Sequence, residues 1–241
     1  MKVLAIGNSF SQDATRYLHG IAKSGGIDMK VVNLYIGGCP LSVHYANALE
    51  DNRAYSMEFN GEPTGFCVSI KEALLSEMWS GWDVVTIQQV SSLSPDYATF
   101  QPYLDFMKDY IKKYSPKSKL YLHQTWGYTQ EHSKECGFKD HADMFAHVKK
   151  AYEQAAKAIK ADGIIPSGEV MNTLMASGAA NVHRDSIHAS LGLGRYALGL
   201  NWYRTLTGNS IKDNGFNDFD EHITETEIAL AKKAVEKIKK G

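Results

Sequence analysis

Five short apolar segments, each followed by a stretch with helical periodicity, constrain the fold of this chain more than any other feature of its sequence. They are Lys2–Ile6, Met29–Ile36, Trp82–Gln88, Lys119–Leu122 and Ile164–Pro166. Each is rich in aliphatic or aromatic residues and ends at glycine, proline or polar residues, as strands buried on both faces do. Their alternation with helices predicts a parallel sheet that is covered by helices on both sides.

A hairpin and several amphipathic helices complete the predicted fold. Asn60-Gly61 separates two alternating runs, a pattern typical of a β-hairpin inserted on one side of the sheet. Further helices are expected over Ser69–Met78, Tyr97–Tyr114 and Glu225–Lys240. No internal repeat, linker or low-complexity segment interrupts the sequence. We therefore predict one domain over residues 1–241, an α/β doubly wound parallel sheet of about five strands.

The composition excludes several classes of function. The formal net charge is −1, so nothing suggests a nucleic-acid partner, and no apolar run approaches the roughly 20 residues of a membrane span. The three cysteines, Cys39, Cys67 and Cys136, show no CxxC spacing, and no GxGxxG or P-loop pattern occurs. We therefore expect no metal and no cofactor. No signal peptide precedes the first strand, which leaves an intracellular protein and a secreted or periplasmic one without its leader as alternatives.

Polar residues and glycines gather at the predicted carboxyl ends of the strands, where parallel sheets collect their ligand sites. The first four strand ends carry Ser9, Gly38, Gln88, Gln89, His123 and Gln124. Ser9 follows a strand and precedes helical periodicity from Asp13, a strand-to-helix turn that also serves the nucleophile of hydrolases. The alternative is that Asn8 and Ser9 are only turn and helix-capping residues.

A second candidate site lies near the carboxyl end of the chain, where Asp185 and His188 are three residues apart just before a helix. At this spacing a carboxylate can accept a hydrogen bond from the imidazole Nδ1–H while Nε2 faces outward. Such an acid fixes the tautomer of a histidine that acts as general base toward a serine. The alternative is that His188 starts a helix and Asp185 caps it.

These segments together resemble the SGNH (GDSL-type) serine hydrolases. The motif GNSFS at residues 7–11 resembles their first block, with Gly-Asn-Ser in place of Gly-Asp-Ser. Asn33–Pro40 is similar to the second block, and Asp185–His188 to the fifth. The resemblance is strongest to a bacterial subgroup of SGNH-like proteins of unassigned function that begin with GNSFS and carry a Gln-Gln strand end. It implies the three-layer α/β/α, flavodoxin-like fold of that superfamily.

The resemblance also implies ester hydrolysis through a Ser-His-Asp triad and an acyl-enzyme intermediate. Ser9 would attack the carbonyl carbon, His188 would act as general base and then as general acid, and Asp185 would orient the imidazole.

The expected oxyanion hole departs from the family pattern. The third block normally reads Gly-x-Asn-Asp and its Asn donates to the oxyanion, whereas residues 88–92 here read QQVSS. A Gln carboxamide offers the same N–H donors on a longer arm. The predicted donors are therefore Ser9 N–H, Gly38 N–H and the side chain of Gln89 (or Gln88).

The resemblance points to a small-molecule or glycan ester as substrate, because short acyl esters, often O-acetyl groups on carbohydrate, are common in such families. Candidates for substrate contact are the polar and aromatic residues near the strand ends: Asn8, His123, Gln124, Trp126 and Tyr128. For the aromatic residues among them, core or lid packing is the alternative.

Two other functions remain open, a non-catalytic carbohydrate- or ligand-binding domain and a flavin- or nucleotide-binding module of the same architecture. The presence of both Ser9 and His188 favours the enzyme.

Overall fold

A computed structural model describes residues 1–76 and 81–238, and within them seven strands form one mixed sheet in the order β4-β3-β2-β1-β5-β6-β7. The strands are β1 (Lys2–Gly7), β2 (Lys30–Tyr35), β3 (Tyr55–Phe59), β4 (Glu62–Val68), β5 (Val84–Ile87), β6 (Lys119–His123) and β7 (Gly163–Ile165). Five of them run parallel, and the hairpin β3–β4 pairs antiparallel with the outer edge of β2. The predicted five-stranded parallel sheet with a hairpin insertion is confirmed, and the hairpin widens the sheet itself.

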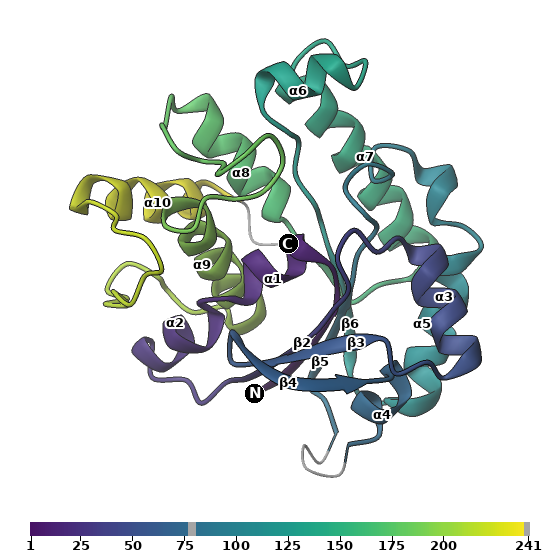
Figure 1. Cartoon of the computed structure of the whole chain (residues 1–241). Coiled ribbons are helices and arrows are strands. Elements are labelled where there is room, and N and C mark those ends of the chain that lie inside the picture. The colour runs from purple at the N-terminus through teal and green to yellow at the C-terminus, as the bar shows by residue number, and fades with distance from the viewer. Residues whose placement is uncertain (77–80, 239–241) are drawn as a thin grey trace.

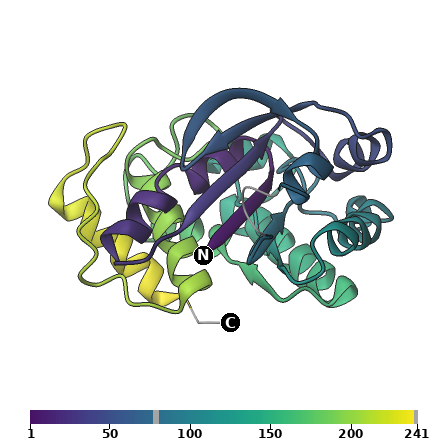
Figure 2. The ribbon, with the colours of Figure 1, turned by 90° about the horizontal axis from the view of Figure 1, so that it is seen from below.

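Helices cover both faces of this sheet (Figures 1 and 2). One layer contains α1 (Ser9–Thr15), α2 (Leu18–Ser24), α8 (Ser167–Ala176), α9 (Leu193–Thr207) and α10 (Glu225–Lys237). The other contains α3 (Leu41–Glu50), α4 (Ile70–Leu74), α5 (Tyr103–Tyr114) and α7 (His141–Ile159). Side chains alternate along β1, so that Val3 and Ala5 join the first layer's core while Leu4 and Ile6 join the second. Both faces of the central strand are therefore buried, as its apolar sequence predicts.

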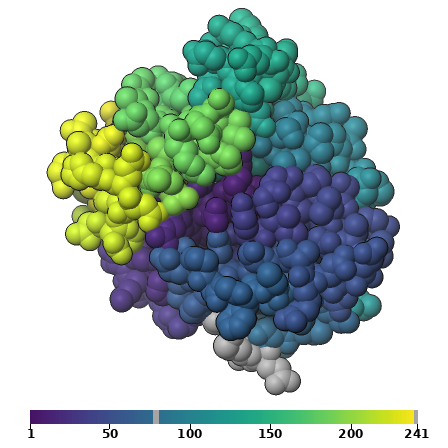
Figure 3. Space-filling view, in the orientation of Figure 1, coloured from purple at the N-terminus to yellow at the C-terminus, as the bar shows by residue number. Residues whose placement is uncertain are grey.

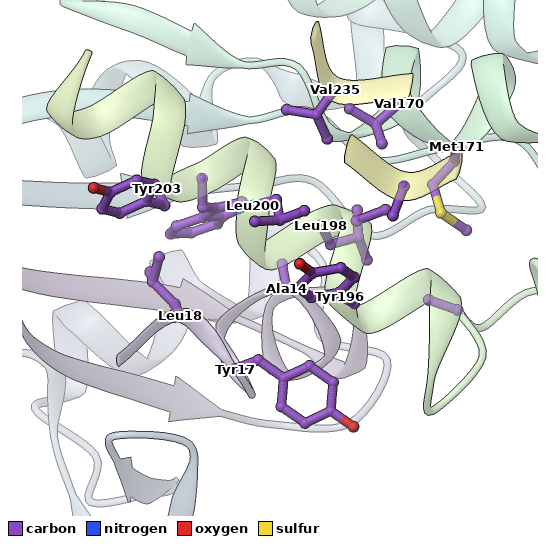
Figure 4. Close-up of a cluster of buried hydrophobic side chains, with 14 of the residues drawn as sticks. Ala14, Tyr17, Leu18, Val170, Met171, Tyr196, Leu198, Leu200, Tyr203 and Val235 are labelled. Atoms are coloured by element: carbon purple, nitrogen blue, oxygen red, sulfur yellow. The ribbon is translucent and has the colours of Figure 1, made fainter. Parts of the chain in front are cut away.

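Helix α9 is the centre of the first layer. Figure 4 shows its apolar side chains packed between the α1–α2 segment on one side and helices α8 and α10 on the other. The contributing side chains include Ala14, Tyr17, Leu18, Val170, Met171, Tyr196, Leu198, Leu200, Tyr203 and Val235. This packing anchors α1 and therefore also Ser9, its first residue.

Two predicted helices differ from the structure in their bounds. The stretch Tyr97–Tyr114 is divided into the 3-10 helix η2 (Tyr97–Phe100) and α5, because Pro102 has no N–H to continue a helix and restricts the residue before it. The helix after β1 begins at Ser9, four residues before the predicted start at Asp13, because the side chain of Asn8 caps it there.

Two further predicted helices reach beyond the described residues. Of the stretch Ser69–Met78, the structure shows α4 after a capping box at Ser69, but this helix ends at Leu74, earlier than predicted, and residues 77–80 lie outside the described part. Of Glu225–Lys240, it shows α10, which ends at Lys237 before the extended residue Ile238, and residues 239–241 lie outside the described part. A short helix α6 (Gln130–Glu135) completes the set in the loop after β6.

The topology places the end of β1 at the point where the strand order reverses. From β1 the chain passes to β2 on one side, whereas β5, β6 and β7 follow on the other. Ligand sites of open α/β sheets lie at the carboxyl ends of the strands at this switch point. Ser9 lies two residues after the end of β1, at the start of α1, and is therefore placed there.

Candidate active site

Asn8 shapes the turn that presents Ser9. Its buried Oδ1 accepts hydrogen bonds from Phe10 N (3.0 Å) and Gln88 Nε2 (2.8 Å), and its Nδ2 donates to the carbonyl of Cys39 (3.3 Å). One carboxamide thus ties the Ser9 turn to the end of β5 and to the turn after β2. Asn8 was expected to contact substrate, but the structure buries it and uses both of its polar atoms in this link.

Asp185 and His188 lie on a narrow loop, residues 182–190, whose two arms are joined by backbone hydrogen bonds of 2.9 and 3.0 Å. Within the loop, Asp185 Oδ1 accepts the backbone N–H groups of Ile187 (2.8 Å) and His188 (2.7 Å). Local sequence therefore determines where the carboxylate lies, since both donors come from the next three residues.

The side chains of Ser9, His188 and Asp185 form one hydrogen-bonded row. His188 Nδ1 lies 2.8 Å from Asp185 Oδ2, and His188 Nε2 lies 2.9 Å from Ser9 Oγ. An ionised carboxylate only accepts hydrogen bonds, so Nδ1 carries the proton and Nε2 presents a lone pair to the serine hydroxyl. The structure thus brings together residues that lie 179 positions apart in the chain.

The carboxylate of Asp185 is ionised at neutral pH. Partial burial acts to raise its pKa, but hydrogen bonds from the backbone N–H groups of His188 and Ile187 and from the His188 ring outweigh burial and lower the pKa to about 2. The row faces solvent on one side, because the Asp185 side chain is 49% exposed and that of His188 is 24% exposed. Ser9 itself is partly exposed, so the row also meets solvent at the serine.

Two aromatic side chains support the loop from inside the protein. The ring of Phe10 stacks on Trp126 at 3.9 Å between centroids, and Trp126 Nε1 donates to the carbonyl of Ile187 at 2.9 Å. Trp126 was predicted to contact substrate, but it is 0% exposed. Its indole instead joins the strand end of β6 to the loop that carries His188.

The turn after β2 exposes Gly38 and buries its neighbour. Gly38 has φ +61°, and a Cβ added there would meet no atom, so the turn requires glycine for its backbone conformation. Burial raises the pKa of the Cys39 thiol to about 12, which keeps it protonated and unreactive. The link from Asn8 to the Cys39 carbonyl holds this turn beside the Ser9 turn.

Neither glutamine at the end of β5 presents a free carboxamide to an oxyanion. Gln89 Oε1 accepts the N–H groups of Leu41 (3.0 Å) and Val90 (2.9 Å), and its Nε2 donates to the carbonyl of Thr99 (2.8 Å). Gln88 donates to Asn8, and its Oε1 lies 2.7 Å from His123 Nδ1. The expected role of Gln89 or Gln88 as a third oxyanion donor is therefore not supported, because both side chains bind other parts of the protein.

The remaining predicted substrate contacts are also buried. Burial lowers the pKa of His123 to about 3, and its neutral ring bridges Gln88 and the hydroxyl of Ser167. Gln124 accepts the N–H of Glu169, and the Tyr128 hydroxyl donates to Ser91. For Tyr128, this burial agrees with the alternative of core packing. Position at a strand end did not distinguish side chains that point into the protein from those that reach the surface.

The surface over part of the N-terminal segment is hollowed. Figure 3 shows atoms of the purple N-terminal segment at the bottom of a hollow, between the green segment that includes the 182–190 loop and the indigo segment of α3. Within residues 1–76 and 81–238, no three His, Cys, Asp or Glu side chains are grouped so that they could hold a metal ion. In the same part of the chain, no helix has the length and apolar character needed to cross a membrane.

The chain is similar to one protein family and to several solved structures. The family model described as "Domain of unknown function (DUF4886)" matches residues 2–238. A search of curated proteins finds no match. Among solved structures, a DUF4886 family protein from Bacteroides uniformis is 32% identical, with a TM-score of 0.89 over 98% of this chain and 93% of that one.

Less similar structures share the fold. A protein from Slackia heliotrinireducens, assigned provisionally to the SGNH hydrolases, is 20% identical, with a TM-score of 0.60 over 86% of this chain and 98% of its own. A carbohydrate esterase of family 3 from Talaromyces cellulolyticus is 14% identical, with a TM-score of 0.55 over 88% of this chain and 99% of its own. At these identities the likeness establishes the SGNH hydrolase fold, which the sequence motifs predicted.

Proposed function

The chain belongs to the DUF4886 family and has the SGNH hydrolase fold, and we propose that it is a serine esterase that hydrolyses small acyl esters. One observation carries the proposal: Ser9, His188 and Asp185 form a hydrogen-bonded row at the switch point of the sheet, with spacings of 2.9 and 2.8 Å. A nucleophile, a base within hydrogen-bond reach and a group that orients the base are the parts that acyl transfer needs.

The row supports a two-step reaction. Ser9 Oγ attacks the ester carbonyl while His188 Nε2 takes its proton, and Asp185 stabilises the imidazolium that forms. His188 then donates this proton to the leaving alcohol, which produces an acyl-enzyme. A water molecule, deprotonated by the same Nε2, attacks the acyl-enzyme and releases the acid, and the proton returns to Ser9.

The oxyanion would be held by backbone groups. Ser9 N–H and Gly38 N–H lie on two turns that the Asn8 carboxamide joins, and we propose them as the donors. Loss of one donor of an oxyanion hole lowers kcat by ~10²–10³-fold. Because the carboxamides of Gln88 and Gln89 are used elsewhere, we expect a slower enzyme than one with a third side-chain donor.

For the substrate, we propose an acetyl or similarly short acyl group on a carbohydrate alcohol. The proposal is supported by the hollow over the N-terminal segment, which carries Ser9, and by the carbohydrate esterase among the structures that share the fold. The predicted aromatic contacts do not support it, because Trp126 and Tyr128 are buried. A non-catalytic carbohydrate-binding domain is the second candidate, and it is favoured because the carboxamides of Gln88 and Gln89 both bind other parts of the protein.

The test is release of p-nitrophenol from its acetate ester by wild type, Ser9→Ala and His188→Ala. Exposed histidines hydrolyse this ester slowly without an active site, so His147→Ala, an exposed histidine outside the row, is the matched control. We expect both site variants to lose several orders of magnitude in kcat and the control to keep the wild-type rate. Acetate release from acetylated xylo-oligosaccharides then tests the carbohydrate substrate. Equal rates in all four proteins would exclude the esterase and leave the binding domain.

A further inference from the structure

A buried ion pair attaches the 182–190 loop to helix α1. Arg184 Nη1 donates to both carboxylate oxygens of Asp13, at 2.9 and 2.8 Å, and also to the carbonyl of Ala189 at the far end of the loop. The Asp13 side chain is 0% exposed. Asp13 lies one helical turn after Ser9, and Arg184 immediately precedes Asp185. This contact therefore joins the helix of the nucleophile to the loop of the base.

Asp13 has a second cationic partner, so the protein can be expected to fold when Arg184 is replaced. Arg195 Nε donates to Asp13 Oδ1 at 2.9 Å, and Arg195 Nη1 lies 2.6 Å from Asp220 Oδ2. Asp220 in turn pairs with Arg16. A buried charge that loses all of its partners destabilises a protein strongly, but without Arg184 the Asp13 carboxylate still has Arg195. The pair with Arg184 is therefore not needed to neutralise the buried acid.

The two contacts of the row differ in what holds them. The contact between His188 and Asp185 lies within the loop, and so do the backbone bonds that orient Asp185. It is retained if the loop moves as a unit. The contact between His188 Nε2 and Ser9 Oγ joins the loop to α1, so it depends on how the loop is attached.

We propose that Arg184 is a positioning residue, which sets the distance between Ser9 and His188 by clamping the loop to Asp13. This inference rests on the proposed esterase function. A displacement of about 1 Å between reacting groups can lower a rate by ~10²-fold. Arg184 touches neither the serine nor the imidazole, so it acts through the geometry of the loop.

The test compares Arg184→Gln with Arg16→Gln in the ester assay, with melting temperature and kcat measured over pH. Arg16 belongs to the same ion-pair network and directly follows α1, but it pairs with Asp220 and Glu62 and not with the loop. We expect Arg184→Gln to lose ~10–100-fold in kcat. Its KM and the pH midpoint of kcat/KM should stay at wild-type values, because the His188–Asp185 pair remains intact. Arg16→Gln should lower the melting temperature comparably and keep kcat within about threefold of wild type.

A third variant covers the case that Arg184→Gln does not fold. Arg184→Lys keeps the positive charge but places it on a shorter side chain with a different group geometry, so an intermediate kcat is expected. If wild type and Ser9→Ala hydrolyse the ester equally, the proposed function fails. If the activity depends on Ser9 but the Arg184 variants keep kcat within threefold, or if they shift the pH midpoint together with kcat, the positioning role is wrong.

Discussion

Replacing Asp185 by asparagine tests the direction of the hydrogen bonds in the row. Asp185 Oδ1 accepts two backbone N–H groups, those of Ile187 at 2.8 Å and His188 at 2.7 Å. In Asp185→Asn, only the amide oxygen can accept these two bonds, so the NH₂ group must face His188 Nδ1. The ring then has to accept at Nδ1, which moves its proton to Nε2, opposite the hydroxyl of Ser9.

The magnitude follows from the two ways in which the variant can respond. An imidazole in the wrong tautomer cannot take the serine proton, which costs ~10⁴-fold in kcat, or about 5.5 kcal/mol. Turning the amide over would restore the tautomer but would lose two backbone hydrogen bonds at ~1–3 kcal/mol each. The protein adopts whichever is less costly, so we expect a loss between ~30-fold and ~10⁴-fold.

The assay is the Ser9-dependent rate of ester hydrolysis, with Asp143→Asn as the control. Asp143 also lies near a histidine, with its Oδ1 3.7 Å from His147 Nδ1, but on the exposed surface of α7. The control should keep the wild-type rate. A rate for Asp185→Asn within threefold of wild type would refute the tautomer argument. A second expectation concerns stability. The pKa of Asp185 is about 2 in the folded protein and ~3.9 in an unfolded chain, so ionised Asp185 stabilises wild type above about pH 4 and this stabilisation disappears toward pH 2. Asp185→Asn should lack this pH dependence of the free energy of unfolding.

Three further predictions concern residues around the row. Asn8→Asp should destabilise the protein by ~1–3 kcal/mol at pH 8, because an ionised carboxylate cannot donate to the Cys39 carbonyl. At pH 4.5 the loss should be smaller, because a protonated carboxyl can donate this hydrogen bond. Urea unfolding that gives the same loss of stability at both pH values would contradict this. Trp126→Phe removes the donor to the Ile187 carbonyl, so it should lower the free energy of unfolding by ~1–3 kcal/mol and should also lower kcat. A less stable protein with unchanged kcat would mean that the indole does not position the loop. Gln89→Leu should lower the melting temperature, because buried backbone groups lose their partners, but leave kcat within about threefold of wild type; a hundredfold loss would restore Gln89 as an oxyanion donor.

The fold and the candidate nucleophile and base could be predicted because their patterns are local. Five apolar runs with polar ends are enough to predict a parallel sheet, and Asn60-Gly61 is enough to predict the hairpin. Asp185 and His188 are three residues apart and bond to each other within one loop, so their spacing alone predicts the contact. The candidate nucleophile Ser9 could be predicted from its place in a strand-to-helix turn.

The other features depend on contacts between distant segments, which periodicity does not report. The side chain of Gln89 binds Leu41, which lies 48 positions away, and a strand-end position is compatible with either direction of its carboxamide. Trp126 is an amphipathic side chain whose ring can line a cleft or fill a core. The pair of Asp13 and Arg184 spans 171 positions, and the only hint in the sequence is that Arg184 precedes the Asp185 motif.

The central claim, that Ser9 is a nucleophile activated by His188, is tested most directly by covalent labelling. A fluorophosphonate reacts with activated serines, and mass spectrometry of the digested protein identifies the labelled peptide. The account predicts a single adduct on the peptide that contains Ser9, no adduct in Ser9→Ala and much slower labelling in His188→Ala. Labelling at another residue that persists in Ser9→Ala, or equal labelling rates in wild type and His188→Ala, would contradict it.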